Sequence, residues 1–441
     1  MAHVVTCFVR ERGKVLLTRR SDAVGTYRGR WAGVSGYVES DSADPENGSL
    51  DAERDARREL REEIGLTDDD LELVRTGETI DVDDAEGSFV VHPFLFESDT
   101  REVTTNEELA AVEWVDPTAI RERETVPRLW ETWRRVAPTV ETVRTDRTHG
   151  SAWIAARALE VLRDAAAEAG EDATDWDDVL GVAGDLRDAR PEMAAVANRV
   201  NRVVAGSRRG NDDCDRLVER AIDALASAFE ADDAAARTAA TRLRDDGTTA
   251  VATLSRSGTV REAIAELTTA NGRPLAELVV AESRPEREGV GVAEWAARET
   301  DATVTLTTEA GLPTALAARD VGAVLVGADS IRPNGDVVNK TGTRVLALAA
   351  WDLDVPLYAV ASKDKVWPAS DGRDAAPAVP DVDSPADAVY DGDAEVAVHA
   401  PTFEVTPAAL VDGVATEAGL LDDAAIREVA AAHAANASWG E

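Results

Sequence analysis

The chain has few cysteines and no long apolar run. Its 441 residues include two cysteines, Cys7 and Cys214, too few for a disulfide framework or a zinc site. A membrane-spanning helix needs about 18 consecutive apolar residues, and the sequence contains no such run. The N-terminal segment alternates apolar and polar residues too early for a signal peptide. We therefore expect a cytoplasmic protein without membrane contact.

Basic charge is scarce as well. Asp and Glu total 85 against 47 Lys and Arg, which gives a net charge of −38. This field repels nucleic acid and argues against a nucleic-acid partner. An acidic, solvated surface is typical of proteins from salt-loving organisms, in which counterions screen self-repulsion. Because lysine is so rare here, the remaining lysines are candidates for phosphate binding, namely Lys14, Lys340, Lys363 and Lys365.

The order of apolar segments predicts an α/β protein of two domains. Residues 1–138 read as strands with a charged helix at residues 51–64 and a short connecting helix, PRLWETWRRV, before a boundary near Pro138, and residues 139–245 read as helices. Residues 246–441 alternate short apolar runs with helices, which predicts βαβ units and a parallel sheet. Such sheets bind ligands at the carboxyl ends of their strands. Residues 369–399 are rich in Ala, Asp and Pro and predict a surface loop.

A cluster of glutamates marks a first candidate site. Glu59, Glu62 and Glu63 are spaced i, i+3 and i+4, so they share one face of the helix. A divalent cation would relieve their repulsion, and Mg²⁺ prefers oxygen ligands. Arg58 is placed to brace the cluster, and Gly36 allows a close backbone approach. The three glutamates alone leave open a second interpretation, a solvated acidic helix face.

The full string RELREEIGL at residues 58–66 resembles the Nudix signature REUxEExGU at every fixed position. The resemblance covers roughly residues 3–120. It implies an α/β/α sandwich with a mixed sheet and hydrolysis of a nucleoside-diphosphate-linked pyrophosphate. It also implies that Glu59, Glu62 and Glu63 hold Mg²⁺ or Mn²⁺ beside Arg58. Arg19 and Arg20 end a predicted strand and are candidates to pair with substrate phosphate.

One position departs from the Nudix pattern. The pattern has a further glutamate eight residues before the arginine, where this chain has Leu50, and the preceding loop is longer. Glu39 and Glu46 are candidates to replace that glutamate. A more distal glutamate often serves Nudix enzymes as a base, and the candidates for that role are Glu107 and Glu108. Both are equally well explained as loop charges.

Polar motifs at predicted strand ends mark a second candidate site. Taken singly, each is an ordinary turn, but together they point polar groups at one rim of the parallel sheet. The last motif places Asn339 and Lys340 at the start of a predicted helix, where free N–H groups and the ammonium would bind a phosphate. The motifs are TLSRSGTV at residues 253–260, AESRP at 281–285 and VGADSIRPNGDVVNKTGT at 326–343.

These motifs strongly resemble the family of initiation factor 2B subunits, ribose-1,5-bisphosphate isomerase and methylthioribose-1-phosphate isomerase. The resemblance spans roughly residues 143–441 and includes THGS around Gly150, RPEM from residue 190 and TEAGL ending at Leu420. It implies a helical subdomain (139–245), a Rossmann-like parallel-sheet subdomain (246–441) and a homodimer formed through this domain.

The same resemblance bears on catalysis. The family's isomerases move protons with a cysteine and an aspartate. The aspartate matches Asp329, but Ser255 stands where the cysteine belongs. A hydroxyl titrates far above a thiol and carries protons poorly at neutral pH. We therefore expect a module that binds a nucleotide or sugar phosphate without isomerase activity, through Gly150, Ser255, Arg284, Asp329, Asn339 and Lys340.

Three hypotheses follow for the whole chain. The first is a Nudix pyrophosphohydrolase fused to a non-catalytic ligand-binding module. The second is a sugar-phosphate aldose–ketose isomerase with an accessory Nudix domain. The third is a regulatory binding protein of the initiation factor 2B type. Ser255 argues against the second hypothesis, and the intact signature at residues 58–66 argues against a Nudix domain without catalysis.

Overall fold

A computed structural model describes residues 1–39, 51–169, 176–207, 213–269, 274–369 and 385–440. The chain divides into two compact units, which we treat separately. The first comprises Met1–Thr139 with Arg163–Asp172, and the second comprises Val140–Leu162 with Ala173–Glu441. Within the described ranges, no helix combines the length and the apolar character needed to cross a bilayer.

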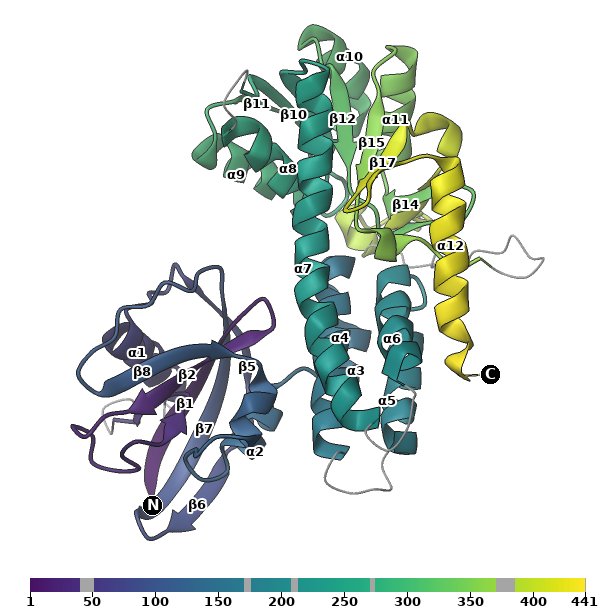
Figure 1. Cartoon of the computed structure of the whole chain (residues 1–441). Helices are drawn as coiled ribbons and strands as arrows, with labels where there is room; N and C mark the ends of the chain where they lie inside the picture. The colour runs from purple at the N-terminus through teal and green to yellow at the C-terminus, as the bar shows by residue number, and fades with distance from the viewer. Residues whose placement is uncertain (40–50, 170–175, 208–212, 270–273, 370–384, 441) are drawn as a thin grey trace. The chain divides into compact units, whose positions relative to one another are not determined.

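The first unit is built on a mixed sheet of eight strands (Figure 1). Its central strand β1 pairs in parallel with β7 and antiparallel with β2 and β4. The other strands extend the sheet on both sides of this centre. The strands are β1 (Ala2–Glu11), β2 (Lys14–Arg20), β3 (Trp31–Ala32), β4 (Val34–Tyr37), β5 (Leu71–Thr76), β6 (Ile80–Asp84), β7 (Gly87–Ser98) and β8 (Leu109–Val115).

One helix packs on each face of this sheet. Helix α1 (Ala52–Ile64) covers one face, where its Leu60 packs in one cluster with Val5 of β1. Helix α2 (Leu129–Val136) covers the other face, where Trp133 meets Phe8 edge-on at 5.4 Å between ring centroids. Alternate side chains of β1 thus enter opposite cores, as strand geometry requires. The predicted α/β/α sandwich with a mixed sheet is confirmed.

The charged helix begins and ends where the sequence predicts. The Asp51 side chain caps α1 by accepting a hydrogen bond from the Arg54 N–H, and Gly65 ends the helix with φ 76°. An N-cap carboxylate and a left-handed glycine are the usual helix boundaries. These caps fix the register that places residues 58–63 relative to the sheet.

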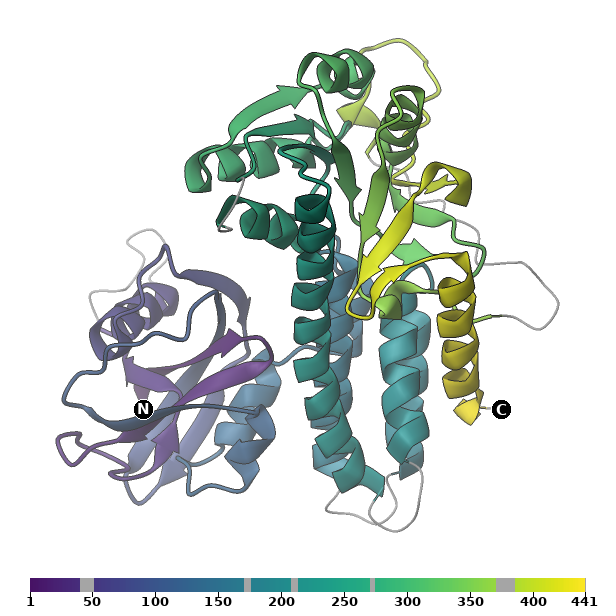
Figure 2. The same cartoon turned by 45° about the horizontal axis from the view of Figure 1, so that its top comes forward.

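The second unit begins with helices. The longest, α7, has 33 residues. It packs against α6 and, further along, against helix α8 (Gly258–Thr269) and strands β15 (Leu357–Val360) and β17 (Gly413–Thr416) (Figures 1 and 2). The sequence shows the helical character of this region, but it does not single out α5 or reveal that α7 runs on to Asp245. The helices are α3 (Val140–Thr145), α4 (Ser151–Ala169), α5 (Trp176–Ala189), α6 (Ala194–Ser207) and α7 (Asp213–Asp245).

A seven-stranded sheet forms the rest of the second unit. Its order is β11-β10-β9-β12-β15-β17-β18, and all neighbours are parallel except β17 and β18. The chain runs outward from β9 and then crosses to β12, so the strand order reverses between β9 and β12. The strands are β9 (Ala250–Leu254), β10 (Glu277–Ala281), β11 (Thr303–Thr307), β12 (Ala323–Val326), β15 (Leu357–Val360), β17 (Gly413–Thr416) and β18 (Gly419–Leu421).

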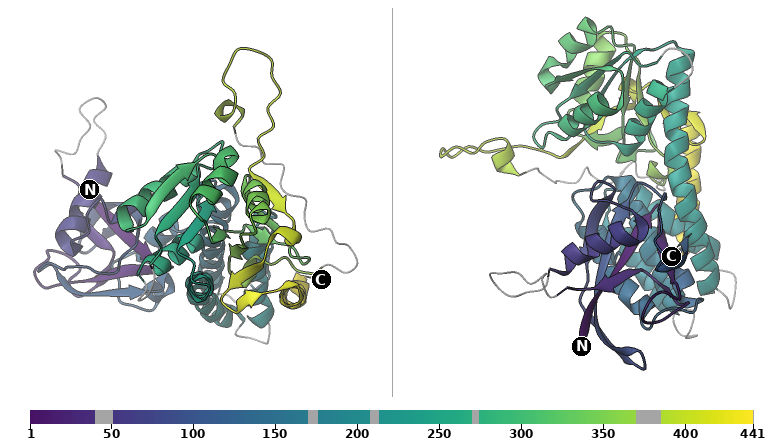
Figure 3. Two further views of the ribbon diagram at one scale, coloured as in Figure 1. Left: turned by 90° about the horizontal axis from the view of Figure 1, so that it is seen from above. Right: turned by 90° about the vertical axis from the view of Figure 1, so that its left-hand side faces the viewer.

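Helices cover both faces of this sheet, as in doubly wound folds (Figure 3). Val251 of β9 packs in one core with α7, α8 and α9, whereas Ala252 packs in the other core with α10, α11 and α12. The predicted Rossmann-like parallel sheet is confirmed. The covering helices are α8 (Gly258–Thr269), α9 (Glu288–Glu299), α10 (Leu312–Ala318), α11 (Thr343–Asp352) and α12 (Asp423–Ala437).

The prediction that Asn339 and Lys340 open a helix is wrong. Both residues end strand β14 (Val337–Lys340), which lies between β13 (Ser330–Ile331) and β16 (Phe403–Thr406) in a small antiparallel sheet. Helix α11 begins only at Thr343, after Gly342 with φ 104°. The partner strand β16 lies some sixty residues away in the sequence, since Asn339 pairs with Glu404. No local pattern could reveal it.

The predicted surface loop at residues 369–399 is described only in part. Residues 370–384 lie outside the described ranges. Residues 385–399 hold one short 3-10 helix, Ala386–Ala388, and no strand.

A buried ion pair joins α6 to the segment after β15. Asp364 is 3% exposed. Its carboxylate accepts hydrogen bonds from Arg199 Nε at 3.1 Å and Arg202 Nη2 at 2.9 Å. Asn198 donates to the backbone carbonyls of Asp364 and Val366. Burial alone would raise the pKa of Asp364, but the hydrogen bonds and charges of Arg202 and Arg199 hold it well below its usual range.

Asp364→Asn should therefore destabilise the second unit. Removing one partner leaves the buried Arg199 charge uncompensated, and such losses reach about 3–5 kcal/mol. Because the folded pKa is lowered, the wild-type advantage is present at pH 7 and shrinks as the pH falls below about 4. Urea denaturation at pH 7 and at a pH below about 4 measures the difference in free energy of unfolding between wild type and variant. The substitution Asp188→Asn, at an exposed residue, is the control. A variant that unfolds at the wild-type urea concentration at pH 7 would contradict this account.

Candidate active site

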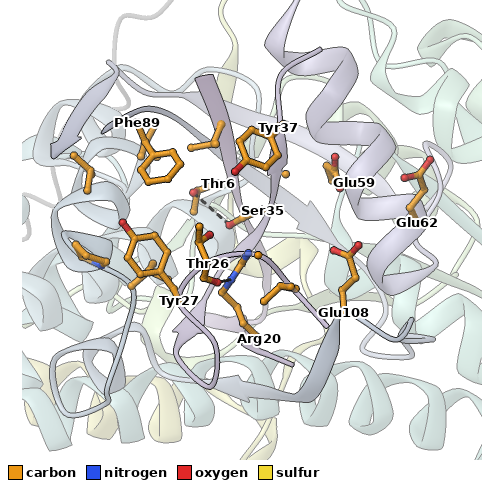
Figure 4. A pocket seen from close by; sticks show the side chains of 18 of the residues that line it. Thr6, Arg20, Thr26, Tyr27, Ser35, Tyr37, Glu59, Glu62, Phe89 and Glu108 are labelled. Atoms are coloured by element: carbon orange, nitrogen blue, oxygen red, sulfur yellow. Dashed lines mark hydrogen bonds between the residues drawn. The ribbon is translucent and has the colours of Figure 1, made fainter. Parts of the chain in front are cut away.

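The first unit contains a cavity of about 480 Å³ with two chemically different ends. Figure 4 shows carboxylates at one end and aromatic rings at the other. Helix α1 and Glu108, the residue before β8, supply the acidic end, whereas Tyr37 of β4, strands β6 and β7 and the segment after β2 supply the apolar end. The lining includes Arg58, Glu59, Glu62 and Glu108 at the acidic end and Tyr27, Tyr37, Val82, Phe89 and Val91 at the apolar end.

Gly36 permits the closest contact of the site. It pairs with Val5 of β1 and lies directly under the side chain of Glu59. A Cβ atom at position 36 would stand 2.0 Å from Glu59 Cδ, far inside van der Waals contact. Any larger residue would displace the carboxylate, so the glycine sets where the Glu59 oxygens lie.

Arg58 organises the carboxylates around it. Its Nη2 donates to Glu59 Oε1 at 2.7 Å and to the Tyr37 carbonyl at 3.1 Å. Its Nη1 lies 2.7 Å from Asp55 Oδ1 and 2.8 Å from Glu39 Oε1. One guanidinium thus fixes three carboxylates and a strand carbonyl, a use to which its planar set of donors is suited. Arg58 thus holds Glu59 from within the cavity lining.

The remaining signature glutamates differ in exposure. Glu62 is exposed and lines the cavity, whereas Glu63 is 3% exposed and lies behind the lining. Burial, followed by the charges of Glu59 and Glu108, raises the pKa of Glu63 to about 8. Burial also raises the pKa of Glu59. In the described part of the chain, no three His, Cys, Asp or Glu side chains lie close enough together to enclose a metal ion.

The structure separates two pairs of neighbouring candidates. A register shift in β2 lies between Arg19 and Arg20. Arg20 lines the cavity and donates to the Thr26 carbonyl, whereas the exposed Arg19 donates to the Gly29 carbonyl. Glu108 lines the cavity, but Glu107 does not appear in its lining. Glu39 lies at the cavity and is held by Arg58, while Glu46 and Leu50 fall outside the described residues.

The second candidate site lies at the carboxyl ends of β10, β9 and β12. Ser255 follows β9 and Asp329 follows β12, so they flank the point where the strand order reverses. Ligands of open α/β sheets bind at this point. Ser255 has φ 58°, a conformation that costs energy for a residue other than glycine.

Glu288 connects the residues of this site, and sequence reasoning missed it. The Ser255 hydroxyl donates to Glu288 Oε2 at 2.6 Å, and the same oxygen lies 3.4 Å from Lys340 Nζ. Lys340 also pairs with Glu286. Glu288 is the first residue of α9, and a Cβ at Gly289 would lie 1.9 Å from the Ala281 carbonyl oxygen. The AESRP motif ends three residues before Glu288 and was the available signal.

Asp329 and Asn339 lie beside this group. Asp329 is half-buried, and desolvation raises its pKa while Lys365 opposes the rise and Glu288 adds to it. Ser151, the residue after Gly150, is near enough to act on the same carboxyl. Asn339 donates to the Thr343 hydroxyl at 3.0 Å. The structure thus brings Ser255, Asp329 and Lys340 together. Asn339 directly precedes Lys340 in the chain, and Gly150 precedes Ser151, which acts on Asp329.

Two parts of the predicted phosphate site are arranged differently. The Arg284 side chain is exposed and lies 3.9 Å from Glu282 Oε1. The N–H groups of Gly342 and Arg344, at the start of α11, both donate to Glu404 Oε1 at 2.7 and 2.9 Å. A carboxylate of the chain therefore caps the helix that was expected to bind a phosphate together with Lys340.

Two family models match the chain, one over each of its two parts. Residues 147–423 match the model of the initiation factor 2 subunit family, and residues 1–136 match the model of the NUDIX domain. The chain belongs to the initiation factor 2 subunit family and carries an N-terminal Nudix domain. We call the region of the first match the initiation factor domain.

Curated relatives of this chain include methylthioribose-1-phosphate isomerases. That of Geobacillus kaustophilus is 34% identical over 137 residues, 30% of this chain and 39% of the relative. That of an Anaeromyxobacter species is 36% identical over 141 residues, with 30% and 40% covered. The chain therefore spans about two fifths of the length of these relatives.

Solved structures share the fold of the initiation factor domain. A crystal structure of the translation initiation factor eIF-2B of Pyrococcus horikoshii OT3 is 28% identical with a TM-score of 0.52, and the match covers 64% of this chain and 94% of that one. The 5-methylthioribose 1-phosphate isomerase of the same organism is 21% identical with a TM-score of 0.51, covering 74% and 90%. At this identity the second likeness concerns the fold alone.

The close approach at Gly289 gives a matched test of how Glu288 is positioned. Gly289→Ala should destabilise the initiation factor domain by about 1–3 kcal/mol, because the new methyl group meets the Ala281 carbonyl. Gly291→Ala, two residues further along α9, meets nothing within 4 Å and should stabilise the helix slightly. Urea denaturation of both variants checks this. Equal effects of the two substitutions would show that α9 does not press on β10.

Proposed function

We propose that the Nudix domain is a metal-dependent pyrophosphohydrolase that acts on a nucleoside-diphosphate-linked or related substrate. The observation that carries the proposal is the single cavity with carboxylates at one end and aromatic rings at the other. A pyrophosphate with its counter-cation suits the first end, and a base or another flat group suits the second.

Mg²⁺ or Mn²⁺ is the proposed cofactor, held by Glu59, Glu62 and Glu63. The donor set suits a hard cation in its chemistry, because it consists of carboxylate oxygens alone; in this structure the three side chains do not yet enclose an ion. The pKa of about 8 at Glu63 supports this fit, since burial and the negative charges of Glu59 and Glu108 outweigh the opposing effect of Arg20. Such an ion, when bound, polarises a phosphoryl oxygen and lowers the pKa of a water ligand.

The chain's own residues would then orient substrate and water. Arg58 holds Glu59 in place through a 2.7 Å hydrogen bond, and Arg20 lines the cavity where it can pair with a phosphate. We assign Glu108 as the proton acceptor of the attacking water. The water oxygen bonds to phosphorus, the bridging P–O bond breaks, and the water proton passes to the Glu108 carboxylate.

At the other end, the rings of Tyr27, Tyr37 and Phe89 would hold the non-reacting part of the substrate. Tyr27 and Phe89 lie 6.1 Å apart between ring centroids, and the Tyr27 hydroxyl donates to Asp84 at 2.9 Å. This bond anchors the Tyr27 ring at the cavity wall. A nucleoside base is the kind of flat group that stacks on such a surface.

Glu62→Gln should abolish metal-dependent hydrolysis and leave the fold intact. Because Glu62 is exposed, replacing it with glutamine removes the negative charge of a proposed metal-binding carboxylate without disturbing the core. The assay is phosphate or nucleotide release from nucleoside diphosphate derivatives with Mg²⁺. Glu53→Gln, on the same helix and outside the cavity lining, is the control and should keep wild-type turnover. Wild-type turnover by Glu62→Gln would refute its role as a ligand.

We further propose that the initiation factor domain binds a sugar phosphate or nucleotide at the strand ends and forms a homodimer. Ser255, Asp329, Asn339 and Lys340 would contact the ligand beside Gly150, with Arg284 at the rim. The support is the meeting of Ser255, Lys340 and Asp329 at the point where the strand order reverses. On ligand binding, Lys340 would exchange its ion pairs with Glu286 and Glu288 for a contact with the phosphate.

Lys340→Ala should weaken ligand binding about tenfold or more, because a charge-assisted contact contributes about 1.5–3 kcal/mol. Calorimetric titration of AMP and pentose phosphates into the full chain measures it. Lys14→Ala is the control, since Lys14 pairs with Asp116 in the Nudix domain. If every ligand that binds does so with unchanged affinity, Lys340 does not contact the ligand.

A further inference from the structure

A second cavity lies beside the buried ion pair of Asp364. It measures about 740 Å³ and follows one face of α7, next to α6 and the 3-10 turn Lys363–Lys365. We propose that this cavity binds an inorganic phosphate or pyrophosphate anion, with Arg220 as the main contact. Four cationic side chains line it, one from α6, two from α7 and one from the turn: Arg202, Arg220, Arg237 and Lys363.

The place of Arg220 against α6 depends on a glycine. Gly206 lies directly under the guanidinium, since a Cβ atom at position 206 would stand 2.0 Å from Arg220 Nη2. The guanidinium therefore lies against the main chain of α6, where its Nε is buried. Glycine is unfavourable within a helix compared with alanine. At this position it leaves the space that the guanidinium occupies.

The charge of Arg220 is not compensated by the residues that the structure describes. Its buried Nε has no hydrogen-bond partner, and no described residue forms an ion pair with its guanidinium. Removing a charged donor from water without giving it an acceptor costs free energy. An anion in the cavity would offset this cost, and the planar guanidinium suits the oxygens of a phosphate.

Two carboxylates that line the cavity are held by other cations. Asp364 accepts hydrogen bonds from Arg202 and from Arg199, which lies behind the lining. Glu417 accepts a hydrogen bond from the Lys363 N–H at 3.0 Å and lies 3.7 Å from the Lys363 ammonium. These contacts keep both carboxylates in place, so neither neutralises Arg220.

The remaining lining residues favour a small, strongly hydrated ligand. Asp223 and Glu230 are exposed on α7, where water and salt screen their repulsion of an anion. The other side chains are those of valine, serine and alanine, and none of the described residues that line the cavity is aromatic. A nucleoside base would find no ring to stack on. The cavity therefore suits the anion alone better than a nucleotide.

This cavity is distinct from the strand-end site. None of the residues proposed to bind a ligand at the strand ends lines it. The turn Lys363–Lys365 lies between the two, because its first two side chains line the cavity while the Lys365 ammonium donates to the Ala328 carbonyl, next to Asp329. Substitutions can therefore address each site separately.

Calorimetric titration of phosphate, and separately of pyrophosphate, into the full chain without divalent cations tests the proposal. The wild type should bind at least one of the two anions. Arg220→Gln should weaken this binding at least about tenfold, because a charge-assisted contact is lost. Gly206→Ala should weaken it as well, since its methyl group displaces the guanidinium without removing the charge. The fold tolerates this change, because the displaced group is the flexible end of a side chain.

Two control variants match these changes. Arg244→Gln removes the same charge from α7 outside the cavity lining, and Gly184→Ala adds a methyl group on α5 that meets nothing within 4 Å. Both should bind the anion as the wild type does.

Lys340→Ala separates the cavity from the strand ends, because it should retain the anion site that Arg220→Gln loses. An anion that binds wild type and Arg220→Gln equally, or whose binding is lost only in Lys340→Ala, would overturn the proposal. A wild type that binds neither phosphate nor pyrophosphate would also overturn it. None of these outcomes bears on the metal site proposed for the Nudix domain.

Discussion

Repulsion between carboxylates is the constraint on which both sites depend. The chain has 85 acidic residues and 47 basic ones, so the carboxylates outnumber the cations that could pair with them. In each site a cation is placed among several carboxylates and helps to decide where they lie. Arg58 holds Glu59, Asp55 and Glu39, and Lys340 lies between Glu286 and Glu288. Like charges brought together away from water become reactive, because protonation or a bound cation relieves them.

Backbone geometry makes these clusters possible. In each site a glycine removes the Cβ that would hold a helix away from a strand: Gly36 under Glu59 and Gly289 against the end of β10. The carboxylate-bearing turn of α1 and the first turn of α9 thereby come within contact of the sheet edge. The same device serves two folds with different topologies, a mixed sheet and a parallel one. In both sites the position of the carboxylates depends on a close approach to the main chain at a glycine.

Local sequence patterns predicted what local geometry determines. The spacing of Glu59, Glu62 and Glu63 and the caps of α1 follow from helix periodicity, and the parallel sheet follows from alternating apolar runs. What depends on distant pairing was not predictable: β14 is a strand because β16 pairs with it, which put Asn339 and Lys340 outside the predicted helix. The choice of Arg20 over Arg19 at the cavity depends on a register shift in β2, and the part played by Glu288 depends on how α9 packs.

We infer that the carboxylates around Glu59 form a site for a divalent cation. Titration of Mn²⁺ into the full chain, followed by electron paramagnetic resonance, tests it without reference to any substrate. We expect a Mn²⁺ site in the wild type whose affinity falls at least about tenfold in Glu59→Gln, because a charged ligand oxygen is lost. Equal Mn²⁺ affinity in wild type and variant would contradict it.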